Sequence, residues 1–328
     1  MMTVSVIVVA KNEEQNIKDC LNSLIDQNYP HDQYEIIVVD GGSVDRTQEI
    51  VRIYRDIKLI VDDYGTLGHQ RNTGLENARG TYIVFTDADC IADKMWLQNI
   101  TAAIFQSAND IAGICGPNLI MESDPPFAKI VGYVQETFFG SGGSVQTKNS
   151  TKKIEANTLP NCNSIYKSEI IKQVRYDNSI GIGEDADLNF RLKKKGFKFL
   201  YAPDAIVWHH RVPTYKKFVT KMLSYGEAIG HVSKKNRSIV RWYSMVPSFA
   251  LILFLPYLML MLILKSILLL FVLIAAFVLY IITLLLTTLI VLRRVKNSSA
   301  LWTLLVLPTQ HIIYGLGFLK AYLLEGRG

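Results

Sequence analysis

The stretch Thr81-Tyr82-Ile83-Val84-Phe85-Thr86-Asp87-Ala88-Asp89 decides the fold, because an apolar run of strand length ends in two carboxylates one residue apart. Such a run is typical of a buried strand whose carboxyl end presents Asp87 and Asp89. Ligands of open α/β sheets bind at that end of the strands. Alternation along an extended chain places both carboxylates on one side, where they suit Mg²⁺ or Mn²⁺ beside a diphosphate. The alternative is a simple turn, since Asp is a common turn residue.

Other short apolar runs predict the rest of the sheet. Between the first four runs in chain order the sequence has helical periodicity, as in Ile17, Leu21, Leu24 and Ile25. This alternation predicts an α/β fold, with a mostly parallel sheet and helices on both faces. The turn after the first run lacks Gly-x-Gly-x-x-Gly, which argues against a dinucleotide-binding Rossmann domain. The runs are Val4–Ala10, Tyr34–Asp40, Lys58–Val61, Thr81–Thr86 and Ile111–Gly116.

Charge and hydropathy divide the chain near residue 232. Residues 1–232 contain 25 Lys and Arg and 28 Asp and Glu, whereas residues 233–328 contain 10 and 1. We expect a basic juxtamembrane segment over 233–244, followed by a membrane domain over 245–328. Its stretches 245–264 and 267–292 are each long enough to cross a hydrocarbon core of roughly 30 Å.

A third apolar stretch, 300–319, is interrupted by Pro308, Gln310 and His311. Hydropathy favours a third span over a re-entrant or interfacial helix. The basic segment 215–237 has apolar residues at helical spacing. It suits either a helix lying flat on an anionic membrane or a surface helix of the soluble domain.

Basic residues predict the orientation in the membrane. Clusters precede the first span and follow the second, and the positive-inside rule places both on the cytoplasmic side together with residues 1–232. No cleavable signal peptide is expected, because residues 1–10 run straight into a strand. The four cysteines lack metal-ligand spacing and are expected to be reduced. The basic clusters are Lys234, Lys235, Arg237 and Arg241, and Arg293, Arg294 and Lys296.

Five motifs over about the first 210 residues, taken in order, resemble those of glycosyltransferase family 2. The resemblance implies a GT-A fold, a nucleotide-sugar donor, Mg²⁺ or Mn²⁺, and inversion at the anomeric carbon. With the C-terminal spans, the chain is most similar to membrane-attached enzymes of exopolysaccharide or archaeal lipid-linked glycan assembly. The motifs are Ser5-Val6-Ile7-Val8-Val9-Ala10-Lys11-Asn12-Glu13-Glu14, Val39-Asp40-Gly41-Gly42-Ser43-Val44-Asp45-Arg46-Thr47, Gln70-Arg71-Asn72-Thr73-Gly74, Asp87-Ala88-Asp89 and Gly183-Glu184-Asp185-Ala186-Asp187.

The resemblance also implies which residues bind the donor. Asp40 is expected to accept the N3–H of a uracil, and Glu13 to reach the same base or the ribose. Arg71 suits a diphosphate, because a guanidinium offers forked donors and stays charged. Asp45 reads mainly as a helix N-cap. The full nucleotide-sugar-binding set is Ala10, Asn12, Glu13, Asp40, Arg71, Asp87 and Ala88.

The implied metal ligands are Asp87, Asp89 and His209, although a His after an apolar strand is as often structural. A metal is expected because the leaving diphosphate must be neutralised. Asp185 is the implied base that takes the acceptor hydroxyl's proton. For an ionised phosphate acceptor, Asp185 would only position it.

Glu184 and Asp185 can also be explained as structural residues, because acidic side chains stabilise the first turn of a helix, here 184–195. An acceptor-side region is expected over about 117–210. Its candidate residues are Gly142, Gly143, Asn161 and Glu184.

The sequence therefore predicts a metal-dependent inverting enzyme that moves one sugar, from a UDP-linked donor, to a polyprenyl-linked glycan or a polyprenyl phosphate. A processive synthase is disfavoured, because Ser238–Trp242 keeps Arg-Trp but lacks the Gln of Gln-x-x-Arg-Trp. A nucleotidyltransferase is disfavoured because Lys11–Glu14 is acidic rather than glycine-rich. An inactive scaffold is disfavoured because the acidic motifs are intact. Membrane lipids are expected partners, and nucleic acid is not.

Overall fold

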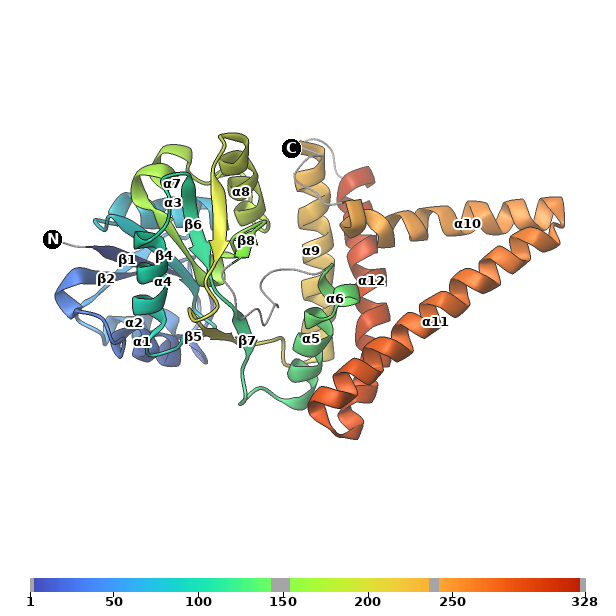
Figure 1. Ribbon diagram of the computed structural model, residues 1–328, viewed down its shortest axis with the longest axis horizontal. Coiled ribbons are helices and arrows are strands. Elements are labelled where there is room, and N and C mark those ends of the chain that lie inside the picture. Colours follow the sequence, from blue (N-terminus) through green and yellow to red (C-terminus); the bar gives the residue numbers. More distant parts are fainter. Residues whose placement is uncertain (1–2, 143–153, 236–241, 325–328) are drawn as a thin grey trace. The chain divides into compact units, whose positions relative to one another are not determined.

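The computed structural model describes residues 3–142, 154–235 and 242–324. Contacts divide the chain into two compact units (Figure 1). The sheet unit comprises Met1–Met121 and Val145–His210, and the helical unit comprises Glu122–Ser144 and Arg211–Gly328. Gly143 and residues 238–241 of the Arg-Trp segment lie outside the described residues. The domain boundaries expected from composition stay a prediction.

The larger sheet of the sheet unit has eight strands among the described residues, and the five strands expected from the sequence are all present, with ends that differ by at most one residue. The first four in chain order, β1 to β4, are mutually parallel, whereas β9 runs antiparallel between β4 and β6. The strand order is β3 (Ile57–Val61), β2 (Tyr34–Asp40), β1 (Val4–Ala10), β4 (Tyr82–Asp87), β9 (Ser164–Lys167), β6 (Ile111–Cys115), β10 (Lys198–Tyr201) and β8 (Ile154–Ala156).

Helices cover both faces of this sheet, as predicted. Alternate residues of the central strands face different cores, so Val38 packs with α1 and α4 while Ile37 packs with α3 and α8. In α1, Ile17, Leu21 and Leu24 of the expected stripe are buried, whereas Ile25 is exposed. The helices of this unit are α1 (Ile17–Ile25), η1 (His31–Gln33), α2 (Thr47–Arg52), α3 (Leu67–Asn77), α4 (Trp96–Phe105), η3 (Asn161–Asn163), α7 (Ser168–Val174) and α8 (Glu184–Lys194).

A second, three-stranded sheet has its first strand directly after the Asp-x-Asp motif. Its order is β5 (Cys90–Ala92), β11 (Val207–His209) and β7 (Asn118–Ile120). In the antiparallel pair of β5 and β11, His209 lies opposite Cys90. A residue late in the chain is thereby brought beside the start of β5.

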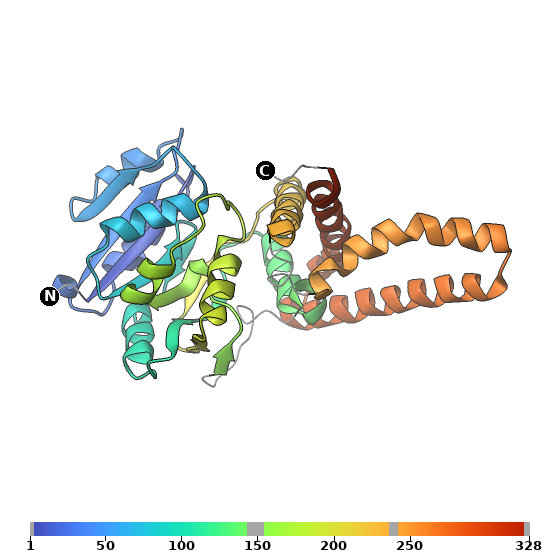
Figure 2. The same ribbon diagram turned by 90° about the horizontal axis from the view of Figure 1, so that it is seen from above.

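The helical unit contains three helices that are long and apolar enough to cross a membrane, over Val246–Leu264, Ile267–Val295 and Ser298–Leu324. The first two form a hairpin (Figure 2). Residues Glu122–Ser144, inserted within the sheet unit's sequence, belong to this unit. Its described helices are α5 (Pro126–Glu136), α6 (Phe138–Ser141), α9 (Tyr215–Lys235), η5 (Trp242–Met245), α10 (Val246–Leu264), α11 (Ile267–Val295), η6 (Ser298–Trp302), α12 (Thr303–Leu319) and η7 (Lys320–Leu324).

Candidate active site

Strand register brings three candidate residues to one edge of the large sheet. Ala10 at the end of β1 lies opposite Asp40 of β2, and Val9 lies opposite Asp87 of β4. A pocket of about 230 Å³ opens at this edge. It is lined by Val9, Ala10, Lys11, Glu13, Leu67, Arg71, Asp87, Ala88 and Asp89. Five of the seven expected donor-binding residues therefore share one pocket with Asp89.

The other two, Asn12 and Asp40, hold the loops behind this pocket together. Asn12 has a positive φ of 57°, and its side-chain oxygen accepts the N–H of Val44. Asp40 is fully buried. Its carboxylate accepts hydrogen bonds from the N–H and hydroxyl of Ser43 and from the side chain of Gln48. Their contact with a nucleotide stays a prediction.

Asp45 lies at the start of α2, where its carboxylate accepts the N–H of Thr47 at 3.0 Å. It also accepts the N–H of Glu14 in the loop after β1. Asp45 therefore bonds the first residue of α2 from one position before the N-cap, which is Arg46 rather than the expected Asp45. It also joins two loops that border the site.

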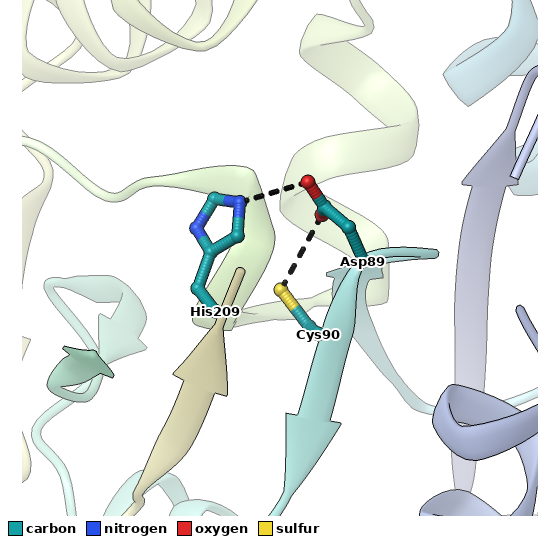
Figure 3. A group of neighbouring side chains, drawn as sticks. All are labelled: Asp89, Cys90 and His209. Carbon is teal, nitrogen blue, oxygen red and sulfur yellow. Dashed lines mark hydrogen bonds and ion pairs between the residues drawn. The ribbon is translucent and has the colours of Figure 1, made fainter. Parts of the chain in front are cut away.

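Asp89 and His209 meet because β11 pairs with β5 (Figure 3). The Nε2 atom of His209 lies 3.2 Å from a carboxylate oxygen of Asp89. Cys90 completes this group, in which the possible ligand atoms all lie within 4.8 Å of one another. Burial raises the pKa of the Cys90 thiol well above its usual value, so it stays protonated at neutral pH. The carboxylate and the imidazole are then the two groups that could bind a metal, and this oxygen and nitrogen set suits Mn²⁺ or Mg²⁺.

Arg71 is a buried cation shared between two carboxylates. Its side chain donates to Glu184 at 3.0 Å and to Asp87 at 3.2 Å. Burial works to lower the pKa of Arg71, but these two carboxylates outweigh it and raise that pKa. The remaining nitrogen, Nη1, is buried and has no hydrogen-bond partner among the described residues. A buried donor of this kind is costly unless a ligand satisfies it.

Glu184 links Arg71 to a second buried chain of hydrogen bonds. The same Glu184 oxygen accepts from the amide of Asn161 at 3.0 Å, and Asn161 accepts from the hydroxyl of Tyr176 at 2.8 Å. Asn161 and Glu184, both expected to face the acceptor, are buried and bonded to each other. Gly142, the other described acceptor-side candidate, ends α6 in the helical unit with a φ of 62°.

Asp185 follows Glu184 in the first turn of α8 and is partly exposed. Burial and the adjacent Glu184 carboxylate raise the pKa of Asp185 to about 7, against the opposing effect of Arg71. A carboxylate with such a pKa is half ionised near neutral pH, which suits a general base. The geometry thus gives the two neighbouring acids different surroundings.

Sequence reasoning missed Lys11, Leu67 and Tyr176. Lys11 and Leu67 line the pocket, and the position of Lys11 beside Ala10 was the available signal. Tyr176 carries no motif. Its hydroxyl matters only because the fold places it beside Asn161.

Comparison with known proteins gives the family. The sequence profile described as "Glycosyl transferase family 2" matches residues 5–175, just over half of the chain. The chain is 28% identical over 259 residues to Glycosyltransferase AglE of Haloferax volcanii, covering 77% of this chain and 81% of that protein. It is 25% identical over 252 residues to the Methanococcus voltae dolichyl N-acetyl-alpha-D-glucosaminyl phosphate 3-beta-D-2,3-diacetamido-2,3-dideoxy-beta-D-glucuronosyltransferase, covering 74% and 77%.

A solved structure is similar over almost the whole chain. It is the mannosyltransferase PcManGT from Pyrobaculum calidifontis, in complex with GDP-Man and Mn²⁺, with a TM-score of 0.65 and 17% identity. The match covers 98% of this chain and 87% of that one. This likeness confirms the GT-A fold with a helical C-terminal region. Since the family profile accounts for the strands and loops that form the pocket, the chain belongs to glycosyltransferase family 2 and is a transferase enzyme.

Proposed function

We propose that this chain moves a single sugar from a nucleotide sugar to a membrane-associated acceptor, with Mg²⁺ or Mn²⁺ bound and with inversion at the anomeric carbon. The observation that carries the proposal is the position and hydrogen bonding of Arg71. Arg71 lines the pocket at the ends of the parallel strands and keeps one buried nitrogen without a partner among the described residues. A forked, permanently charged donor in that position suits the oxygens of a nucleoside diphosphate.

Asp89 and His209 are the residues that would hold the metal, and Asp87, which lines the same pocket, is the third ligand expected from the sequence. A divalent cation there would supply charge neutralisation for the departing diphosphate. Asp87 also fixes Arg71 from the other side. Together, Arg71 and the bound cation would place positive charge near the leaving group. The mannosyltransferase solved with GDP-Man and Mn²⁺ supports this class of ligand. We keep UDP as the first expectation.

Asp185 is the proposed base. Its raised pKa lets it hold the acceptor hydroxyl's proton as that oxygen attacks the anomeric carbon. The sugar's bond to the diphosphate breaks as the new bond to the acceptor oxygen forms. The nucleoside diphosphate leaves with the bonding electrons, and Asp185 keeps the proton.

The proposed acceptor is a polyprenyl-linked glycan or a polyprenyl phosphate. The named Methanococcus relative acts on a dolichyl-linked sugar phosphate, and three helices of this chain are apolar enough to cross a membrane. An enzyme held at the bilayer meets lipid-linked substrates at high effective concentration. We further propose that the sheet unit faces the cytoplasm, where nucleotide sugars are made.

The test is nucleotide release by the full-length protein in membranes. UDP-glucose, UDP-N-acetylglucosamine and GDP-mannose are supplied with Mn²⁺, with a chelator, and with Mn²⁺ restored. We expect release from at least one donor, loss with the chelator, and recovery with the metal. Asp89→Ala is expected to abolish release while the protein stays folded and membrane-bound.

The matched control is Asp110→Ala, which removes an exposed carboxylate paired with Lys198 just before β6, away from the pocket. It should keep full activity. No release from any of a full panel of nucleotide sugars would refute the proposed sugar transfer, and release that is indifferent to chelation would refute the metal assignment.

A further inference from the structure

Helix α9 sets the membrane depth of the helical unit. Its 21 residues are enough to cross a bilayer, but lysines lie near both of its ends and Glu227 lies between them. If α9 crossed the bilayer, Lys221 and Glu227 would lie near its centre, where charged side chains are costly. α9 therefore stays outside the hydrocarbon core, at a depth where its lysines reach headgroups and water. The lysines are Lys216, Lys217, Lys221, Lys234 and Lys235.

Helix α12 runs beside α9 in the same direction. Near the start of α9, the hydroxyl of Tyr215 lies 3.0 Å from that of Thr309. Eleven residues further on, the backbones touch, because a Cβ atom at Gly226 would lie 2.8 Å from the amide nitrogen of Phe318. Since both helices advance together between these contacts, residues 309–318 lie at the same depth as α9.

Two polar side chains in the middle of α12 also bind the backbone of the short helix α6. Gln310 donates to the carbonyl oxygen of Gly140, and Nε2 of His311 lies 3.1 Å from the carbonyl oxygen of Phe139. These carbonyls belong to the four-residue helix α6, which ends at Gly142. The polar side chains of Gln310 and His311, which interrupt the apolar stretch, therefore bind backbone of the helical unit itself.

Exposure separates α12 from the hairpin of α10 and α11. In α10 and in α11, only 6% of the 18-residue apolar stretch is buried within the protein, as expected when lipid surrounds a span. In the segment of η6, α12 and η7 the share is 39%. This segment exposes apolar side chains along one stripe and buries Val306, Leu307 and Phe318 on another face. The exposed stripe is Leu301, Leu305, Ile312, Leu316 and Leu323, at spacings of four and seven residues.

The two views of the helical unit agree with these contacts. α9 and α12 lie side by side and run across the direction in which the α10 and α11 hairpin extends (Figures 1 and 2). We infer that α12 does not cross the membrane, and that α9 and α12 form a layer on the bilayer surface whose exposed leucine stripe contacts lipid. Only α10 and α11 cross. This inference replaces the third span favoured by hydropathy, and it stands without the proposed function.

Two crossings place the start of η6 and the end of the chain on one side of the membrane. Three crossings would place them on opposite sides. The turn between α10 and α11 lies on the far side in either case. The basic clusters before α10 and after α11 share a side in either case, as the positive-inside rule requires, so they do not distinguish two crossings from three.

Cysteine labelling tests this topology in the full-length protein. Three variants carry an added cysteine: Ser266→Cys between α10 and α11, Ser298→Cys at the start of η6, and a cysteine appended after residue 328 through a short polar linker. The four native cysteines are buried in the sheet unit and give little background. Sealed vesicles of both orientations are treated with a membrane-impermeant maleimide, before and after detergent.

We expect the appended cysteine and Cys at position 298 to be labelled from the same side, and Cys at position 266 from the other. An appended cysteine labelled from the side of position 266 would show that α12 crosses and would overturn the inference. Labelling of positions 266 and 298 from one side would also overturn it, because α11 would not cross. Ser298→Cys and Ser266→Cys change one atom each and keep the side-chain size nearly constant.

Discussion

At the scale of single residues, the pocket depends on how firmly Arg71 is held. Two carboxylates orient its guanidinium, and the Glu184 carboxylate is itself oriented by Asn161 and Tyr176. The Phe85 ring lies 5.5 Å below the guanidinium and supports it further. The orientation of Arg71 therefore depends on Asp87 within the pocket and, through Glu184, on the buried side chains of Asn161 and Tyr176.

Tyr176→Phe removes only the hydroxyl that holds Asn161. We expect kcat for donor turnover to fall about tenfold with little change in KM, since small misplacements of a positioning group are costly in the transition state. Steady-state kinetics measures the split.

Tyr166→Phe is the matched control for this change. Tyr166 is equally buried and packs edge-on against the same Phe85 ring, but its hydroxyl donates to Asn189 instead. Its variant should keep the wild-type kcat. Equal losses in the two variants would mean that Tyr176 acts only through stability.

The raised pKa of Asp185 predicts how transfer depends on pH. Desolvation and Glu184 favour the protonated form, so the carboxylate becomes available as a base only when the pH rises through about 7. We expect the rate of sugar transfer to a hydroxyl acceptor to rise about tenfold between pH 6 and pH 8 and then to level off. The sign is opposite for stability, because the pKa of Asp185 in the folded state is raised and its ionisation destabilises that state as the pH rises from about 4 to about 7.

Asp185→Asn tests this assignment. It should lose transfer, retain donor binding, and show no rise in its residual rate over the same pH range. Wild-type transfer by this variant, or a wild-type rate that is flat from pH 6 to pH 8, would contradict the role of base.

At the scale of elements, the sequence predicted what is local. β1 to β4 and β6 were predictable because each is a short apolar run bounded by turns. α1 was predictable from the spacing of its apolar residues, and α8 from acids in its first turn and basic residues in its last. β9 was not, because Ser164–Lys167 is four residues long and its antiparallel place between β4 and β6 depends on distant pairing. The grouping of α5 with the C-terminal helices likewise follows from tertiary contacts.

The site divides in the same way. Asp87, Asp89 and Arg71 were predictable because their motifs follow strands or lie in helices whose positions the pattern gives. The meeting of His209 with Asp89 follows from the register of β11 on β5, which no local signal reports. Asn161 was expected to face the acceptor, but only the fold reveals that both ends of its amide are already bonded.

At the scale of the whole molecule, ligand and lipid act on different compact units. The pocket lies within the sheet unit, whose two cores contain none of the residues of α10 to α12. A ligand that binds only the folded state at about 100 times its Kd stabilises it by about 2.7 kcal/mol. Amides that exchange only when the sheet unit unfolds should then exchange about 100-fold more slowly.

Hydrogen exchange of the full-length protein in micelles, read by mass spectrometry, measures both units at once. With saturating UDP and Mn²⁺ we expect slowing in peptides from β1, β2 and β4, and unchanged exchange in peptides from α10 and α11, because those helices bind no nucleotide. UDP with a chelator is the control and should slow exchange less, since the carboxylates at the pocket repel the diphosphate when no cation is present. Equal slowing in both units would mean that they unfold as one. No slowing with UDP, and none with GDP in the same experiment, would mean that the pocket at the strand ends is not a nucleotide site.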